Sequence, residues 1–201
     1  VIHFAGLKSV RESIQNPINY WDNNVCGTIN LINVMLENHC YNFVFSSSAT
    51  IYSPSKNQTL SEDSIINPIN PYGQTKFTIE NFLKDVYRSQ PNKWRIAILR
   101  YFNPIGAHSS GFLRESCKGV PTNIFPLIIN TGIGKQEEIK IFGNNWPTRD
   151  GTPIRDYIHV MDLAEGHIKV FEYLIDNQPN LINLNLGTGI GTTVLELVKI
   201  F

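Results

Sequence analysis

The sequence lacks an excess of charge of either sign, and it lacks any long apolar run. Its 201 residues contain 17 Lys and Arg against 17 Asp and Glu, so the formal net charge is zero. Because no basic stripe is present, we do not expect a nucleic acid as partner. No apolar stretch approaches the roughly 18 residues that a membrane helix needs, so we expect no membrane span.

Cysteine is also scarce. The three cysteines, Cys26, Cys40 and Cys117, are an odd number without the spacing of metal ligands. This usage favours reduced thiols in a cytosolic protein, and we expect Cys26 in the core. The five histidines form no close-spaced set either, so the sequence predicts no metal site.

A glycine-rich dinucleotide-binding fingerprint is missing as well. The run GTGIG at 187–191 follows a predicted strand and precedes a predicted helix, which is the right context for such a fingerprint. Its spacing is not G-x-G-x-x-G, however, and the chain ends before an acidic residue about 20 positions further on could appear. We therefore interpret 187–191 as a turn with another role.

Both ends of the sequence interrupt a predicted element. The chain begins without Met in an apolar run, 1–4, that is typical of a buried strand. It ends at Phe201 inside an apolar pattern of helical period. Domain boundaries normally fall in exposed linkers, so we expect a fragment that is truncated at both ends.

Short apolar runs alternate with segments of helical period along the chain. Strands that alternate with helices of this length indicate an α/β protein with a parallel sheet. The predicted strands are 1–4, 42–48, 95–101, 139–142 and 181–186, with a short extended piece at 156–160. The predicted helices are 24–39, 71–90, 124–133, 162–175 and 193–201.

The most informative motif is YGQTK at 72–76. Asn70 and Pro71 suit the N-cap and the first position of a helix, so Tyr72 and Lys76 fall in its first turn and on one face. An ammonium near a phenol favours the phenolate and lowers the tyrosine pKa from about 10. Such a tyrosine can accept a proton near neutral pH. The pair alone is also compatible with two surface residues that have no role.

Three serines at 46–48 strengthen the functional interpretation. They lie at the carboxyl end of a predicted strand, where ligands bind in open α/β sheets, although serines can also simply end a strand. A hydroxyl there can share a proton with Tyr72 and a substrate. A second tyrosine–lysine pair of the same spacing, Tyr52 and Lys56, has Pro54 at its centre and is predicted to lie in a loop.

Nine stretches, in order over nearly the whole chain, resemble the UDP-glucose 4-epimerases of the extended short-chain dehydrogenase superfamily. They are FAGLK at 4–8, DNN at 22–24, SSSATIY at 46–52, PYGQTK at 71–76, LRYFNP at 99–104, GVPTN at 119–123, IFG at 141–143, RDYIHVMDLA at 155–164 and NLGTG at 185–189. The resemblance implies a partial Rossmann-like, doubly wound parallel sheet and a smaller α/β substrate-binding domain. It places a partial NAD-binding domain at 1–103 and most of the UDP-sugar part at 104–201, with 154–176 returning to the main domain.

The resemblance also implies roles for individual residues. Tyr72 would take the proton from the sugar 4-hydroxyl, Ser48 would hydrogen-bond the same oxygen, and Lys76 would bind the nicotinamide ribose and lower the Tyr72 pKa. Further NAD contacts would be Phe4, Ala5, Gly6, Leu7, Lys8, Asn23 and Phe102. Further substrate contacts would be Asn103, Asn123, Ile124, Lys140, Ile141, Phe142 and Arg155, of which the arginine suits a diphosphate.

The implied activity is the NAD-dependent interconversion of UDP-galactose and UDP-glucose in galactose metabolism. It would proceed by oxidation at C4, rotation of the 4-keto sugar and re-reduction, in a cytoplasmic homodimer that pairs through the helices at 24–39 and 71–90. We expect that the 201-residue chain alone neither binds NAD well nor turns over, because the adenosine half of the cofactor site is missing.

Three other functions remain open at this point. A nucleotide-sugar 4,6-dehydratase needs an additional acid/base pair, and dehydratases usually carry Thr-Asp-Glu where this sequence has Ser48, Ala49 and Thr50. Other nucleotide-sugar epimerases, for uronic acids or pentoses, fit the motifs. A catalytically silent nucleotide-sugar-binding protein would have no physical need to keep Ser48, Tyr72 and Lys76 together.

Overall fold

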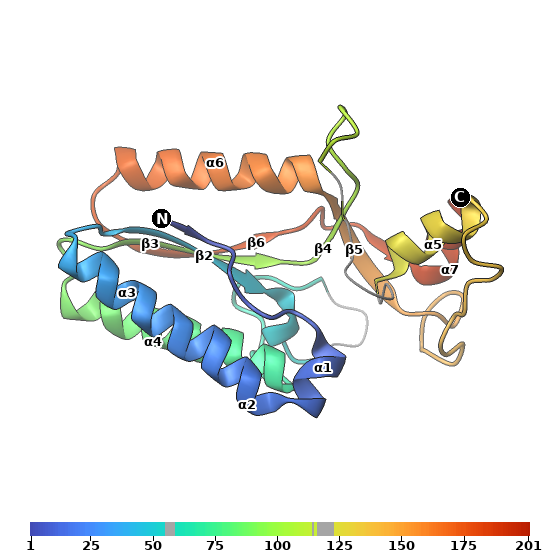
Figure 1. The fold of residues 1–201 in the computed structure, drawn as a ribbon, viewed down its shortest axis with the longest axis horizontal. Helices are drawn as coiled ribbons and strands as arrows, with labels where there is room; N and C mark the ends of the chain where they lie inside the picture. The colour runs from blue at the N-terminus through green and yellow to red at the C-terminus, as the bar shows by residue number, and fades with distance from the viewer. Residues whose placement is uncertain (55–58, 114, 116–122) are drawn as a thin grey trace. The chain divides into compact units, whose positions relative to one another are not determined.

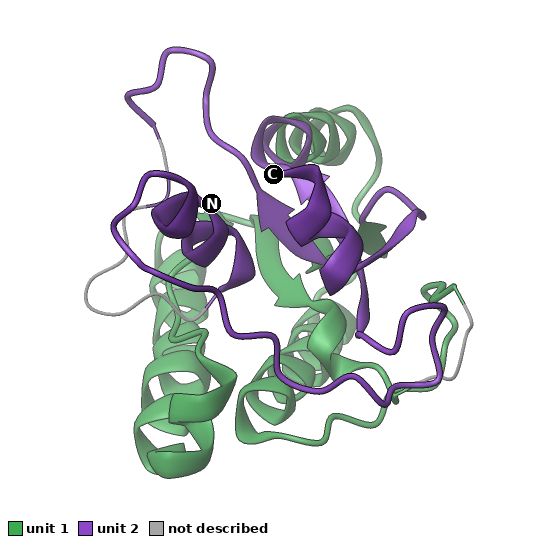
Figure 2. Cartoon of the chain, turned by 90° about the vertical axis from the view of Figure 1, so that its right-hand side faces the viewer, with its two compact units in different colours: residues 1–101, 165–186 green, residues 102–164, 187–201 purple. Residues whose placement is uncertain are grey.

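The chain forms two compact units in the computed structural model, which describes residues 1–54, 59–113, 115 and 123–201. Unit 1 contains Val1–Tyr101 and Glu165–Leu186, and unit 2 contains Phe102–Ala164 and Gly187–Phe201 (Figure 2). Whether these units serve the cofactor and the substrate stays a prediction. The motif at 119–122 and the loop position Lys56 lie outside the described residues.

Unit 1 is built on a parallel sheet in the order β1-β2-β3-β6. Its strands are β1 (Ile2–His3), β2 (Asn42–Ser48), β3 (Arg95–Tyr101) and β6 (Leu181–Leu186). The register sets Ser48 beside Tyr101 and Tyr101 beside Leu186, so three strands end at the same edge. Buried apolar runs in β2 and β3 explain why both strands need cover on both faces.

Helices cover both faces of this sheet, which makes it doubly wound (Figure 1). On one face lie α3 (Gly27–Glu37) and α4 (Pro71–Ser89), and on the other lies α6 (Val160–Asp176), whose part from residue 165 onward belongs to unit 1. Alternate residues of each strand point to opposite faces. The first face therefore buries Ile32, Met35, Phe43, Phe45, Ile79, Leu83, Trp94, Ile96 and Ile98, and the second buries Val44, Ala97, Leu99, Val170 and Leu174.

Helix α4 begins where the sequence predicts. The side chain of Asn70 accepts a hydrogen bond from the backbone N–H of Gly73 at 2.9 Å, and Pro71 occupies the first turn. The helix ends at Ser89, before Pro91, because proline removes a backbone donor and disfavours helical geometry in the residue before it. Its nineteen residues therefore have a defined start and a defined end.

The region before α3 differs from the prediction of one helix over 24–39. Two short helices, α1 (Val10–Gln15) and α2 (Pro17–Tyr20), lead into a π-helical turn at Trp21–Cys26, and α3 starts only at Gly27. This turn directs Asn24 and Thr28 inward. Cys26 lies on the other side and is exposed, so the expectation that it belongs to the core is wrong.

Unit 2 has a three-stranded sheet in the order β4-β5-β7. Strand β5 (Ile154–His159) pairs in parallel with β4 (Asn103–Ile105) and antiparallel with β7 (Gly191–Thr193). Two helices, α5 (Ile124–Gly132) and α7 (Val194–Ile200), complete the unit. The prediction of a strand at 139–142 is wrong: no described strand pairs with this segment, and Phe142 is 82% exposed.

Mutation can test the apolar core that helices α3 and α4 form with the sheet. Replacing Leu83, which is fully buried, by Ala should lower the free energy of unfolding by about 2–5 kcal/mol, because the side chain leaves a cavity. Ile168→Ala, at an exposed position of α6, should change it by less than about 0.5 kcal/mol. Urea unfolding measures both, and equal losses would contradict this placement of the core.

Candidate active site

Three polar side chains on α4 face the sheet. Tyr72, Lys76 and Glu80 follow one another at steps of four residues, so they lie on one side of the helix. All three are buried, and Glu80 is fully buried. Since charged side chains are rarely buried without a partner, the surroundings of each one indicate what it does.

The Lys76 ammonium is held against strand β2. Its Nζ donates a hydrogen bond to the carbonyl of Ser46 at 2.7 Å, which is its one acceptor among the described residues. It lies 4.8 Å from the ring centroid of Phe45 and 5.9 Å from that of Tyr72. Burial lowers the pKa of Lys76 to about 8, while the nearby carboxylate of Glu80 acts in the opposite direction. The amine therefore stays mostly protonated at neutral pH.

The phenol of Tyr72 behaves differently from the expectation. Burial raises the pKa of Tyr72 above its ordinary value, and a hydrogen bond with Ser48 opposes this only in part. The expected lowering by Lys76 is not found, because the ammonium faces the ring and bonds to the Ser46 carbonyl. In the ligand-free protein the phenol thus keeps its proton.

Ser48 lies where β2 ends and a short 3-10 turn, Ala49–Ile51, begins. Its Oγ accepts the backbone N–H of Thr50 at 3.2 Å and lies 2.9 Å from the hydroxyl of Thr50. These contacts fix the rotamer of the serine beside Tyr72. The chain of hydroxyls from Tyr72 through Ser48 to Thr50 can pass a proton by reorienting O–H bonds.

Asn24 anchors the segment that follows β1. Its side chain accepts the backbone N–H of Leu7 at 2.8 Å and donates to the Leu7 carbonyl at 3.0 Å. The same amide donates to the hydroxyl of Thr75 on α4 at 3.3 Å. A Cβ at Gly6 would lie 3.2 Å from the Asn24 oxygen and 3.7 Å from the Lys76 Nζ, so this segment runs beside the lysine.

The structure brings the predicted cofactor contacts of unit 1 to one region. Phe4, Ala5, Gly6 and Lys8 are exposed at the carboxyl end of β1, Leu7 is partly buried, and the ring of Phe4 lies 4.9 Å from that of His167. Asn23 is exposed next to the buried Asn24. The role of Asn24 was missed, although the DNN run and the inward Asn24 and Thr28, four residues apart, could have indicated it.

The remaining predicted contacts all lie in unit 2, and their roles stay predictions. Asn103 donates to the Asp156 carbonyl at 3.2 Å, Asn123 donates to the Glu115 carboxylate at 3.1 Å, and Lys140 pairs with Glu138 at 3.4 Å. Phe102, Ile124 and Ile141 are partly buried, whereas Phe142 and Arg155 are exposed.

The glycine-rich turn after β6 is closed by an acidic side chain of the same unit. The carboxylate of Asp156 accepts the backbone N–H groups of Thr188 and Gly189 at 2.9 Å and 2.8 Å, and the Thr188 hydroxyl at 2.7 Å. A phosphate would need those same donors and would be repelled by the carboxylate. This geometry supports the interpretation that the turn is not a dinucleotide fingerprint.

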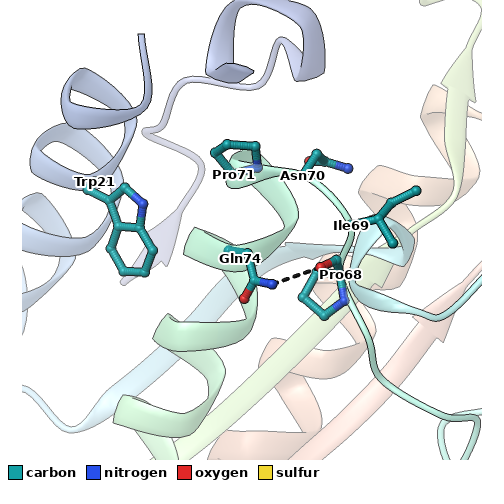
Figure 3. A pocket seen from close by; sticks show the side chains of 6 residues that line it. All are labelled: Trp21, Pro68, Ile69, Asn70, Pro71 and Gln74. Atoms are coloured by element: carbon teal, nitrogen blue, oxygen red, sulfur yellow. Dashed lines mark hydrogen bonds between the residues drawn. The ribbon is translucent and has the colours of Figure 1, made fainter. Parts of the chain in front are cut away.

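A hollow of about 310 Å³ lies at the start of α4 (Figure 3). Gln74 points toward Pro68 and donates to its carbonyl at 2.7 Å. The other lining residues are Trp21, Ile69, Asn70 and Pro71. None of the predicted site residues lines it, so we assign it no part in the site.

The described residues contain neither a membrane-spanning helix nor a cluster of metal ligands. None of their helices combines the length and apolarity needed to cross a membrane. No group of three or more His, Cys, Asp and Glu among them is arranged to hold a metal ion.

Comparison with known proteins connects this geometry to a family. The model of the NAD dependent epimerase/dehydratase family matches residues 1–187. UDP-glucose 4-epimerase 2 of Oryza sativa subsp. japonica is 50% identical over the whole chain, and the bifunctional UDP-glucose 4-epimerase and UDP-xylose 4-epimerase 1 of Pisum sativum is 49% identical. The chain spans 49% and 57% of these relatives, about half of their length.

Solved structures agree in fold. A UDP-glucose 4-epimerase from Bifidobacterium longum, solved with NAD+ and UDP, superposes with a TM-score of 0.93 at 44% identity. One from Stenotrophomonas maltophila, solved with NAD and formylated UDP-arabinopyranose, gives 0.95 at 43% identity. Both comparisons cover 99% of this chain and 59% of the other. They confirm the expected Rossmann-like parallel α/β fold.

The role of Asn24 as an anchor can be tested by comparison with the neighbouring residue Asn23. Asn24→Ala leaves the partly buried N–H and carbonyl of Leu7 without their partner and removes one of the bonds of the buried Thr75 hydroxyl, so the free energy of unfolding should fall by about 1–3 kcal/mol. Asn23→Ala, at an exposed position, should change it by less than about 0.5 kcal/mol. Denaturant titration compares the two variants, and an equal effect would show that Asn24 does not anchor the segment.

Proposed function

The chain belongs to the NAD dependent epimerase/dehydratase family, and we propose that its protein interconverts UDP-glucose and UDP-galactose with bound NAD. The observation that carries this proposal is the grouping of Tyr72, Lys76 and Ser48 at the carboxyl edge of the parallel sheet, beside segment 4–8. Relatives named UDP-glucose 4-epimerase, about half identical over the whole chain, support the choice of substrate. Because the chain spans only part of them, activity, substrates and partners are proposals for the whole protein.

The residues present fit a dinucleotide. Phe4, Ala5, Gly6 and Lys8 are exposed at the end of β1, where ligands bind in parallel sheets, and Gly6 leaves room for the Asn24 side chain. Lys76 keeps N–H groups in addition to the one that bonds to Ser46, and they suit ribose hydroxyls. NAD, when bound, accepts a hydride from C4 of the sugar and later returns it.

Oxidation at C4 removes a hydride from the carbon and a proton from the 4-hydroxyl, and Tyr72 is the residue that would accept this proton. Its phenolate oxygen would take the proton of the sugar 4-hydroxyl and give it back after reduction, with Ser48 bonded to the same oxygen. Since burial raises the pKa of Tyr72, the neighbouring positive charge of Lys76 must offset that burial when the phenolate forms. Ser48 and Thr50 provide a second path for the proton.

Inversion requires that the hexose turns while the nucleotide stays bound. Oxidation at C4 makes this carbon flat, so the hydride can return to the opposite face after the sugar rotates. Strong binding of the remote UDP group would retain the intermediate during that rotation. We propose that Phe102 contacts the nicotinamide and that UDP is held by Asn103, Asn123, Ile124, Lys140, Ile141, Phe142 and Arg155.

A pentose nucleotide is the second candidate substrate. The Pisum sativum relative carries a name that includes UDP-xylose 4-epimerase, and it is 49% identical to this chain. A 4,6-dehydratase is less well supported, because Ala49 and Thr50 stand where the additional carboxylates would be needed. A silent binding protein does not explain why Tyr72 and Lys76 are kept together in a buried position.

We further propose a cytoplasmic homodimer that pairs through α3 and α4. Val34 on α3 is 53% exposed, and Leu31 and Phe82 on these helices are only partly buried. Apolar groups at such positions favour a helix–helix contact between subunits. A reducing compartment is consistent with the free thiols of Cys26 and Cys40.

Loss of the phenol tests the reaction. In the full-length protein, Tyr72→Phe should lower kcat for the conversion of UDP-galactose to UDP-glucose by about 10²–10⁴-fold, because the general acid/base is gone. Tyr87→Phe, near the other end of the same helix, should leave kcat within about twofold. Activity that survives Tyr72→Phe would remove this tyrosine from its role and make Ser48 the next base to test.

A charge on α3 tests the assembly. Val34→Glu should raise the dissociation constant of the dimer by at least about tenfold, because the carboxylate loses water in the contact. Ile168→Glu is the control, since it adds the same charge at an exposed position of α6. Sedimentation velocity over a concentration series measures both, and a dimer that tolerates Val34→Glu must use another surface.

A further inference from the structure

A buried ion pair between α4 and β3 lies next to the site. Arg100 on β3 donates to Glu80 twice, from Nη2 to Oε2 at 2.8 Å and from Nε to Oε1 at 3.1 Å. The side chains are 2% and 0% exposed. The hydroxyl of Ser47 donates to Oε1 at 2.6 Å. Three hydrogen bonds therefore fix the Glu80 carboxylate in place.

The far side of the Arg100 guanidinium is also occupied. Its Nη1 donates to the Tyr52 hydroxyl at 2.8 Å and to the Glu62 carbonyl at 3.0 Å. The Tyr52 hydroxyl in turn donates to the side-chain oxygen of Asn185 at 2.6 Å. Because Arg100 is bonded on two sides, it cannot turn away from Glu80.

Glu80 and the Lys76 ammonium lie between the same helix and strand. Lys76 and Glu80 are one helical turn apart, and they reach neighbouring residues of β2, the Ser46 carbonyl and the Ser47 hydroxyl. The space between helix and strand is buried, so charges act on each other more strongly there than in water. A buried ion pair is weak evidence for stability, since apolar side chains of similar volume often serve as well.

We propose that Glu80 is a positioning residue for the tyrosine–lysine pair: its carboxylate, fixed by Arg100 and Ser47, keeps the Lys76 ammonium charged beside Tyr72. This proposal rests on the proposed function of Tyr72 as acid/base. Glu80 would touch neither substrate nor cofactor, and would act only through Lys76.

The other ionisable groups around Lys76 do not take over this part. On its own helix only Tyr72 also faces it, and that phenol is neutral because burial raises its pKa. From β1 comes His3, whose pKa burial and Lys76 both lower, so it is uncharged at neutral pH. From β2 the contacts are the Ser46 carbonyl and the Phe45 ring. From β3 comes Arg100, whose positive charge is bonded to Glu80 and would disfavour a nearby ammonium rather than support it. Tyr101 of the same strand is a neutral phenol, because burial raises its pKa. Burial lowers the Lys76 pKa, and Glu80 is the charge that raises it.

Without the carboxylate, Lys76 loses its proton at lower pH, and Tyr72 then loses the adjacent positive charge closer to neutral pH. The alkaline limb of the epimerisation rate should therefore move to lower pH, while the rate well below that limb falls less.

The direct test measures the lysine itself. In the full-length protein labelled with [13Cε]lysine, the Lys76 signal is assigned by its absence in Lys76→Met and followed by NMR against pH. Glu80→Gln should lower its titration midpoint by about one pH unit. Glu172→Gln, which removes an exposed carboxylate paired with Lys169, should leave it unchanged. An unchanged midpoint in Glu80→Gln would overturn the proposal.

A double variant separates the carboxylate from the unpaired arginine. Glu80→Gln leaves Arg100 buried without its partner, which could destabilise the fold and itself lower the Lys76 midpoint. Glu80→Met with Arg100→Met removes both charges and keeps the volume, so it should melt closer to wild type while the midpoint stays low. A midpoint that returns to the wild-type value would assign the effect to Arg100 and refute the role of Glu80.

Activity gives an independent measurement. The kcat–pH profile of UDP-galactose conversion should show the alkaline limb of Glu80→Gln shifted by the same amount as the NMR midpoint. A limb that stays in place while the midpoint moves would disconnect Glu80 from catalysis. If the wild-type protein converts no UDP-galactose, the proposed function fails, whereas the NMR titration still decides whether Glu80 sets the charge of Lys76.

Discussion

The site depends on how helix α4 packs against strand β2. Apolar residues such as Ile79 and Leu83 hold the helix to the sheet, but apolar packing alone would tolerate a small shift. The two charged side chains would not, because Lys76 must meet the Ser46 carbonyl and Glu80 must meet Ser47. Sliding the helix would leave buried charges without partners, so the polar contacts set its register.

Burial shifts the pKa values of the tyrosine and the lysine in opposite directions. A site closed to water strengthens electrostatic interactions with a substrate, yet it favours the neutral form of every group inside. It raises the pKa of Tyr72 and lowers that of Lys76, and both shifts oppose a phenolate beside an ammonium. The Ser48 hydroxyl and the Glu80 carboxylate act against these shifts. A reactive pair in a dry site therefore needs supporting groups that an exposed pair would not.

Much of unit 1 could be predicted from the sequence, since its elements are long and locally marked. The predictions of strands at 42–48, 95–101 and 181–186 are confirmed. The apolar runs at 43–45 and 96–99 suit strands covered on both faces. Elements of three or four residues, such as α2 at Pro17–Tyr20 and β7 at Gly191–Thr193, carry too few residues for a period to show. The false strand at 139–142 illustrates the converse: a short apolar run becomes a strand only where a neighbour supplies its hydrogen bonds.

The site was predictable to the extent that its residues are close in sequence. Tyr72 and Lys76 stand one turn apart behind a clear helix start, so their common face follows from spacing alone. Arg100 lies twenty residues beyond Glu80, and Asn24 lies seventeen beyond Leu7, so only the fold brings these partners together. A local sign did exist, however. Glu80 continues the four-residue step of Tyr72 and Lys76, which places a carboxylate on the face that also holds the buried Ile79 and Leu83. Because a charge on such a face requires a partner, it already implies an arginine or lysine on the facing strand.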